Sequence, residues 1–99
     1  MRRSAPRPVG VALEALADAL APATLLAQVQ RAWPEAAGEA FSNVSEPVGE
    51  RDGVVVVACD GAVWAQELDL MSELVVGRLN AALGRPAVRR LRPRATRTR

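Results

Sequence analysis

Apolar positions in the first third of the chain recur every three or four residues, which is the spacing of helices buried along one face. The first helix is predicted over residues 9–20, and Pro22 ends it. Thr24 stands where the N-capping side chain of a second helix is expected. Because Pro34 has no backbone N–H to donate, we expect a kink there or a fresh helical turn over residues 35–40.

The middle of the chain has the pattern of a β-hairpin. Residues 43–48 form a weak strand, and Pro47 within it suits the edge of a sheet. Residues 49–53 are typical of a turn, because Asp-Gly directly before a β-branched run is a hairpin signal. Residues 54–59, VVVVAC, form the strongest strand, and their four consecutive valines favour burial of both faces or nearly so.

A long helix is predicted over residues 62–83, with Gly84 closing it and Pro86 preventing its continuation. Its apolar residues fall on two sides. The main side carries Trp64, Leu68, Met71, Val75, Leu79 and Ala82, and the second carries Val63, Leu70, Leu74 and Ala81. We favour packing of this helix between a sheet and other helices, which would bury both sides. The alternative is that Val63 and Leu70 form an exposed surface for a partner.

A short strand over residues 87–92 follows, and the elements together predict an α+β fold with a three-stranded sheet packed against helices. The expected order is helix, helix, strand, strand, helix, strand. At 99 residues the chain suits one domain. We expect a flexible basic arm over residues 1–8, the domain over 9–92 and an arginine-rich tail over 93–99.

Missing residue types limit the chemistry. The chain has no His, no Tyr and one Cys, so the side chains that build most metal sites and most acid–base or nucleophilic sites are absent. No glycine-rich phosphate loop is present either. We therefore expect no catalytic residues, no metal and no cofactor. Cys59 is expected to pack in the core, and a single cysteine suits a reducing cytoplasm.

Charge is distributed very unevenly, although the net charge is only +2. Residues 1–13 carry +3, residues 14–73 carry −9 and residues 74–99 carry +8. Every basic residue is an arginine. An acidic body with a basic end is the pattern expected of a chain that touches nucleic acid at one place and another partner elsewhere.

The basic end is the strongest chemical signal in the chain. Each guanidinium can donate two hydrogen bonds to a phosphate, and several together release counterions from a polyanion. No aromatic residue interrupts the stretch, so contact with the nucleic-acid backbone without sequence preference is favoured over base stacking. A solvated tail without function is the alternative. The candidate nucleic-acid-binding residues are Arg85, Arg89, Arg90, Arg92, Arg94, Arg97 and Arg99.

An ordered set of landmarks across residues 9–94 resembles the DciA family. The most specific is Trp64-Ala65-x-Glu67-Leu68, directly after the valine strand. The others are Trp33-x-x-x-x-Gly38, Pro47, Asp52-Gly53 before Val54, Leu79-Asn80, Gly84 and Val88-x-x-Leu91-x-x-Arg94.

The resemblance implies a K-homology-like domain acting as an ATP-independent accessory protein of DNA replication. Such a protein would bind the DnaB-type replicative helicase and DNA, here single-stranded, and help to load the helicase in the bacterial cytoplasm, at the nucleoid. The resemblance and the second apolar side together suggest Trp64, Glu67, Leu68 and Leu70 as residues that face or support the helicase.

Two features depart from the expected pattern. No G-x-x-G loop joins two helices, so the nucleotide clamp of K-homology RNA binders does not transfer. The chain also has only short segments outside the domain, whereas members of the family commonly carry a long extension. Two alternatives remain: an RNA-binding K-homology-like protein acting in ribosomal RNA maturation, and a small enzyme, which would need two carboxylates converging in a pocket.

Overall fold

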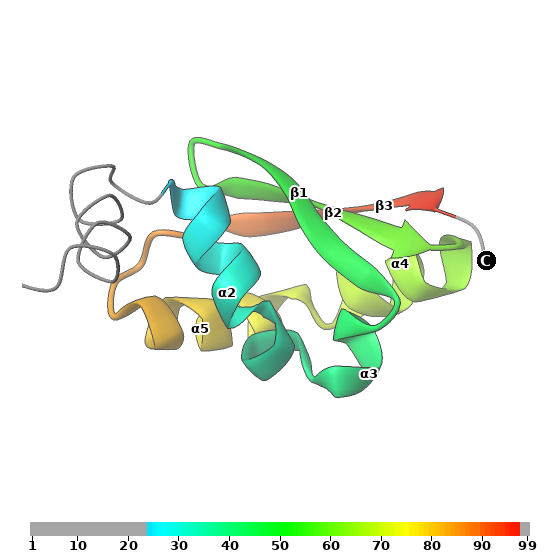
Figure 1. Cartoon of the computed structure of the whole chain (residues 1–99), viewed down its shortest axis with the longest axis horizontal. Helices are drawn as coiled ribbons and strands as arrows, with labels where there is room; N and C mark the ends of the chain where they lie inside the picture. Colours follow the sequence, from blue (N-terminus) through cyan, green and yellow to red (C-terminus); the bar gives the residue numbers. More distant parts are fainter. Residues whose placement is uncertain (1–23, 98–99) are drawn as a thin grey trace, which may run out of the picture.

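The computed structural model describes residues 24–97 (Figure 1). The strands form one sheet in the order β1-β2-β3, with β1 antiparallel and β3 parallel to the central β2. Figure 1 shows α4 and α5 along one side of this sheet, confirming the α+β fold. The helix expected over 9–20 and the arm over 1–8 lie outside the described residues. The elements are α2 (Leu25–Ala37), α3 (Glu39–Ser42), β1 (Ser45–Arg51), β2 (Val54–Asp60), α4 (Ala62–Leu70), α5 (Ser72–Leu83) and β3 (Arg90–Arg97).

Helix α2 begins where the sequence predicts, because the Thr24 hydroxyl accepts a hydrogen bond from the Ala27 N–H at 3.0 Å. It does not restart at Pro34, one of the two outcomes that we expected there, but continues to Ala37. Pro34 lies one turn from the helix end, and its carbonyl accepts from the Gly38 N–H at 3.1 Å. The helix ends at Gly38, which has a φ of +92°. A residue with a Cβ would be strained in this conformation, so glycine is favoured here.

The predicted hairpin joins β1 and β2, but its turn is shorter than expected. Asp52 and Gly53 alone form it, with φ values of +53° and +86°, the signature of a type I′ turn. Strand β1 therefore extends to Arg51, which pairs with Val54. The Glu50 carboxylate holds the turn by accepting from the Gly53 N–H at 2.8 Å. As expected for a strand with Pro47, β1 lies at the edge of the sheet.

Among residues 24–97, helices cover strand β2 on one face only, and its other face is partly buried, with Ala58 5% exposed. Val55, Val57 and Cys59 are fully buried in the core, which confirms packing for Cys59. Val54 and Val56, on the other face, are half-buried. Because β2 is the central strand, its neighbours shield that face in part without any described helix packing on it.

Two tryptophans mark the inner and outer limits of the core. Trp33 on α2 is buried, and its Nε1–H donates to the Ser45 hydroxyl at 3.2 Å. That hydroxyl in turn donates to the Phe41 carbonyl. Trp64 on α4 is half-buried and meets the Phe41 ring edge-on, with ring centroids 5.4 Å apart. Trp33 therefore packs inside the domain, whereas Trp64 lies at its margin.

The helix predicted over 62–83 is two helices, separated at Met71. Met71 has a φ of −98° and a ψ of 5°, outside the helical region. The break lets α4 pack on β2 and β3 while α5 packs on α2. Leu68 of α4 and Val75 of α5 are both fully buried as a result. The sequence has no Gly or Pro at the break. The change of direction follows instead from the different elements on which α4 and α5 pack.

A glycine and an asparagine fix the connection from α5 to β3. Gly84 closes α5 in the left-handed conformation, as predicted, with a φ of +76°. The Asn80 side chain donates to the Val88 carbonyl at 3.0 Å and accepts from the Val88 N–H at 2.8 Å. Strand β3 starts at Arg90, later than expected, and continues into the segment expected to be a tail.

Candidate nucleic-acid interface and partner surface

Strand β3 presents a line of arginines on one face of the sheet. Side chains alternate along a strand, so Arg90, Arg92 and Arg94 share the face opposite to Leu91, which is buried in the core. All three arginines are exposed, and successive ones lie about 7 Å apart along the strand. These three residues are called the arginine row below. Their spacing is comparable to that of successive phosphates along an extended nucleic-acid strand.

Within residues 24–97, the face that carries the arginine row has no helix packed on it, and it is called the open sheet face below. Val54, Val56 and Ala58 of β2 pair in register with Arg90, Arg92 and Arg94. Across β2, the hairpin register places Arg51 beside Val54. The open sheet face therefore has apolar residues along its centre and arginines on both sides at one end.

Arg51 was missed by the sequence analysis, which counted it with the acidic body. The signal was present, because a two-residue Asp52-Gly53 turn fixes the pairing of its flanking residues. Arg51 must then oppose Val54 and share its face. Two strand spacings, about 9.5 Å, separate the backbones of β1 and β3 at this level.

A shallow hollow on this face is called the sheet hollow. Two charged residues that line it, Glu50 and Arg89, make hydrogen bonds that hold the hairpin turn. Glu50 accepts from the Gly53 N–H, as described above, and the Arg89 guanidinium donates to the Asp52 carbonyl at 3.1 Å. The Arg89 N–H also donates to the Gly53 carbonyl at 2.8 Å. The hollow is lined by Glu50, Arg51, Asp52, Val54, Val56, Arg89 and Arg92.

The structure brings together only part of the predicted arginine set. Arg89 holds the hairpin turn beside the arginine row, and Arg85 is exposed in the connection that follows Gly84. Arg97 is the last residue of β3, paired in register with Asp60. Arg99 lies outside the described residues.

The predicted partner residues divide between surface and core. Val63 and Leu70, two turns apart on α4, are 72% and 75% exposed, and Leu74 at the start of α5 is 50% exposed. These three residues are called the α4 apolar surface below. Burial of this second apolar side was therefore the wrong expectation, because α4 packs on the sheet through its other side. Of the remaining predicted partner residues, Glu67 is exposed, Trp64 is half-buried and Leu68 is fully buried.

The surroundings of the α4 apolar surface are acidic. Glu67, Asp69 and Glu73 are all exposed on the two helices that flank Met71. The junction between these helices contains no glycine, and its carboxylates disfavour phosphate.

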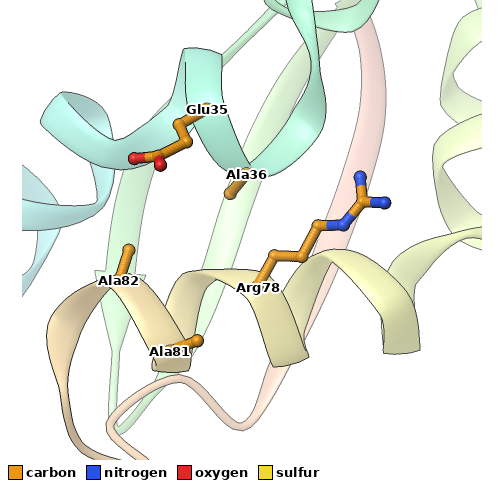
Figure 2. A pocket seen from close by; sticks show the side chains of 5 residues that line it. All are labelled: Glu35, Ala36, Arg78, Ala81 and Ala82. Carbon is orange, nitrogen blue, oxygen red and sulfur yellow. The ribbon is translucent and has the colours of Figure 1, made fainter.

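A second hollow lies between α2 and α5 (Figure 2). Figure 2 shows Glu35 of α2 and Arg78 of α5 extending in different directions beside the alanines of the two helices. The short alanine side chains leave space between the two helices, which accounts for the hollow by packing alone. Its lining residues are Glu35, Ala36, Arg78, Ala81 and Ala82.

Residues 24–97 carry neither a cluster of metal ligands nor a membrane-crossing helix. In this part of the chain, no three His, Cys, Asp or Glu side chains are grouped so that they could hold a metal ion. None of the helices described in it is both long enough and apolar enough to cross a membrane.

The fold and its surfaces define a class: a small α+β domain with a basic, open sheet face and an apolar, acid-bordered helix face. The chain belongs to the DciA family, described as Dna[CI] antecedent, whose family model matches residues 8–92. This confirms the resemblance found in the sequence. The family is associated with loading of the DnaB helicase.

Similar curated proteins come from actinobacterial sources and carry only the name UPF0232. One from Rhodococcus jostii is 30% identical over 89 residues, covering 88% of this chain and 47% of the relative. One from Streptomyces coelicolor is 39% identical over 62 residues, covering 61% of this chain and 33% of the relative. One from Mycobacterium tuberculosis is 28% identical over 89 residues, covering 88% of this chain and 48% of the relative. The chain thus spans half or less of the length of these relatives.

Proposed function

We propose that this chain is an ATP-independent accessory protein of DNA replication, which binds the DnaB-type replicative helicase and single-stranded DNA and assists helicase loading. Membership of the DciA family supports the association with the helicase. One structural observation carries the proposal. The arginine row and the α4 apolar surface lie on opposite sides of the layer formed by the sheet and α4, so both can be occupied together. Such a protein would act in the cytoplasm, at the nucleoid.

The DNA half of the proposal depends on the arginine row. Its three exposed guanidinium groups lie along one straight strand, so one extended polyanion can contact all of them. Backbone contact of this kind carries no sequence preference and weakens as salt rises, because each phosphate contact releases counterions. Exposed carboxylates elsewhere, such as those of Glu39, Glu67 and Glu73, repel phosphate, which favours binding of DNA at the arginine row.

The helicase half depends on the α4 apolar surface. Val63 and Leu70 expose most of their side chains to water, and exposed apolar side chains of this kind gain free energy when a partner covers them. Leu68 would not contact the helicase itself. Its burial against the sheet would fix the orientation of α4 and so position the apolar surface. Trp64 would support the same surface through its contact with Phe41.

The test measures binding to the replicative helicase of the same organism and to single-stranded DNA, at low and moderate salt. One variant combines Arg90→Gln, Arg92→Gln and Arg94→Gln, and a second carries Leu70→Ser. Arg78→Gln, at an exposed arginine on α5, is the control for the loss of one positive charge elsewhere on the surface. We expect the triple variant to lose DNA affinity and to lower the salt slope by about 2, while still binding the helicase. Leu70→Ser should do the reverse.

The opposite results would identify the failing half. DNA binding that is equal in the triple variant and in Arg78→Gln would remove the arginine row from the interface. Unchanged helicase binding by Leu70→Ser would show that the α4 apolar surface is not part of the helicase interface. If the wild-type protein ignores the helicase but holds structured RNA tightly, the RNA-binding alternative replaces the whole proposal.

A further inference from the structure

The sheet hollow combines features that a phosphate site does not need. Its floor is formed by Val54 and Val56, which are half-buried and apolar, while Arg51 and Arg92 stand at its two sides. A phosphate gains nothing from an apolar floor. A flat, partly apolar group with polar edges gains from both the floor and the sides.

We propose that this hollow receives one unstacked base of a single strand whose phosphates lie along the arginine row. The inference rests on the proposed DNA binding and adds to it a second contact and a new residue, Arg51. A guanidinium plane can stack on a base, and single-strand readers use such stacking when aromatic residues are absent. A duplex cannot use the hollow, because its bases are stacked inside.

The register of the sheet sets the required span. Arg51 lies across β2 from Arg90, with the backbones of β1 and β3 about 9.5 Å apart. A nucleotide whose phosphate contacts the arginine row can therefore extend its base across the valines of β2 towards β1. The base then lies between the side chains of Arg51 and Arg92.

The charges of the two edge strands give the bound strand one orientation. The side of the hollow formed by β1 and its turn carries Asp52 beside Arg51, whereas the β3 side carries only arginines. Carboxylates repel phosphate but accept hydrogen bonds from the amino groups of bases. Phosphates therefore belong on the β3 side and the base on the β1 side.

The experiment compares two single strands of equal length, one with normal bases and one with abasic sugars throughout, by fluorescence anisotropy on the full chain. Arg51→Ala should weaken binding to the normal strand about two- to fivefold and leave the abasic strand unaffected. Arg92→Gln should weaken binding to both strands. Arg78→Ala on α5 is the control, and circular dichroism verifies that each variant is folded.

A second variant tests the floor of the hollow without removing a charge. Val56→Thr keeps the shape of the side chain but replaces a methyl group by a hydroxyl. It should weaken binding to the normal strand only, as Arg51→Ala does.

Each outcome separates this inference from the proposed function. If Arg51→Ala binds both strands as the wild type does while Arg92→Gln weakens both, the base site is wrong and DNA binding by the arginine row stands. If Arg51→Ala weakens both strands equally, Arg51 contacts phosphate and the base site is again wrong. If the wild type binds neither strand, the DNA half of the proposed function fails and the inference fails with it.

Discussion

Replacing Asn80 by alanine tests whether one side chain holds the connection that leads into the arginine row. The Asn80 amide makes two hydrogen bonds to the backbone of Val88, at 2.8 and 3.0 Å. Each is worth about 1 kcal/mol net, and Val88 is only 2% exposed, so water cannot fully replace them. We expect Asn80→Ala to lower the free energy of unfolding by about 2–3 kcal/mol.

Urea denaturation followed by circular dichroism measures this loss, and thermal unfolding should show a decrease in Tm of about 10–20 °C. Asn80→Asp retains the acceptor for the Val88 N–H but turns a carboxylate oxygen towards the Val88 carbonyl oxygen, so it should also be less stable than the wild type. Arg78→Ala, exposed on the same helix, should change stability by no more than about 0.5 kcal/mol. A loss below about 0.5 kcal/mol for Asn80→Ala would refute the assignment of this side chain as the link between α5 and β3.

Three further substitutions test the fold by the same denaturation assay. Gly53→Ala should cost about 1–3 kcal/mol, because the residue has a φ of +86° and a Cβ there would lie 2.9 Å from the Ala87 carbonyl oxygen; a neutral result would contradict the turn geometry. Trp33→Phe loses the hydrogen bond to Ser45 and should cost about 1–2 kcal/mol, whereas stability equal to the wild type would show that this bond contributes nothing. Leu68→Ala should cost about 2–5 kcal/mol, since the side chain is fully buried; a surface-like loss below about 0.5 kcal/mol would mean that Leu68 faces solvent.

Features governed by neighbouring residues could be predicted from the sequence. The Asp52-Gly53 turn, the Thr24 cap and the Gly84 helix end each depend on a side chain or a backbone angle within a few positions. The arginine row was found as a charge cluster, but its alignment on one face required β3 to continue past residue 92, where a tail was expected. Its first residue, Arg90, pairs with Val54, thirty-six positions away, and no local pattern encodes that partner.

Features governed by distant packing could not be predicted. The break at Met71 follows from α4 and α5 meeting different neighbours, so a continuous apolar pattern concealed it. The same cause left Val63 and Leu70 exposed, because only one side of α4 contacts the sheet. Arg51 was overlooked because its charge was added to a segment total, although its position in the hairpin decides what it faces.

The single layer of packed side chains between the sheet and α4 also fixes a distance. Leu68 fills that layer between α4 and the sheet, and a helix with its side chains is about 10–12 Å across. A strand bound on the open sheet face and a protein bound on the outer side of α4 would consequently stay about 15–20 Å apart. Because close-packed interiors resist compression, the domain would behave as a rigid spacer that sets how near the strand can come to its partner.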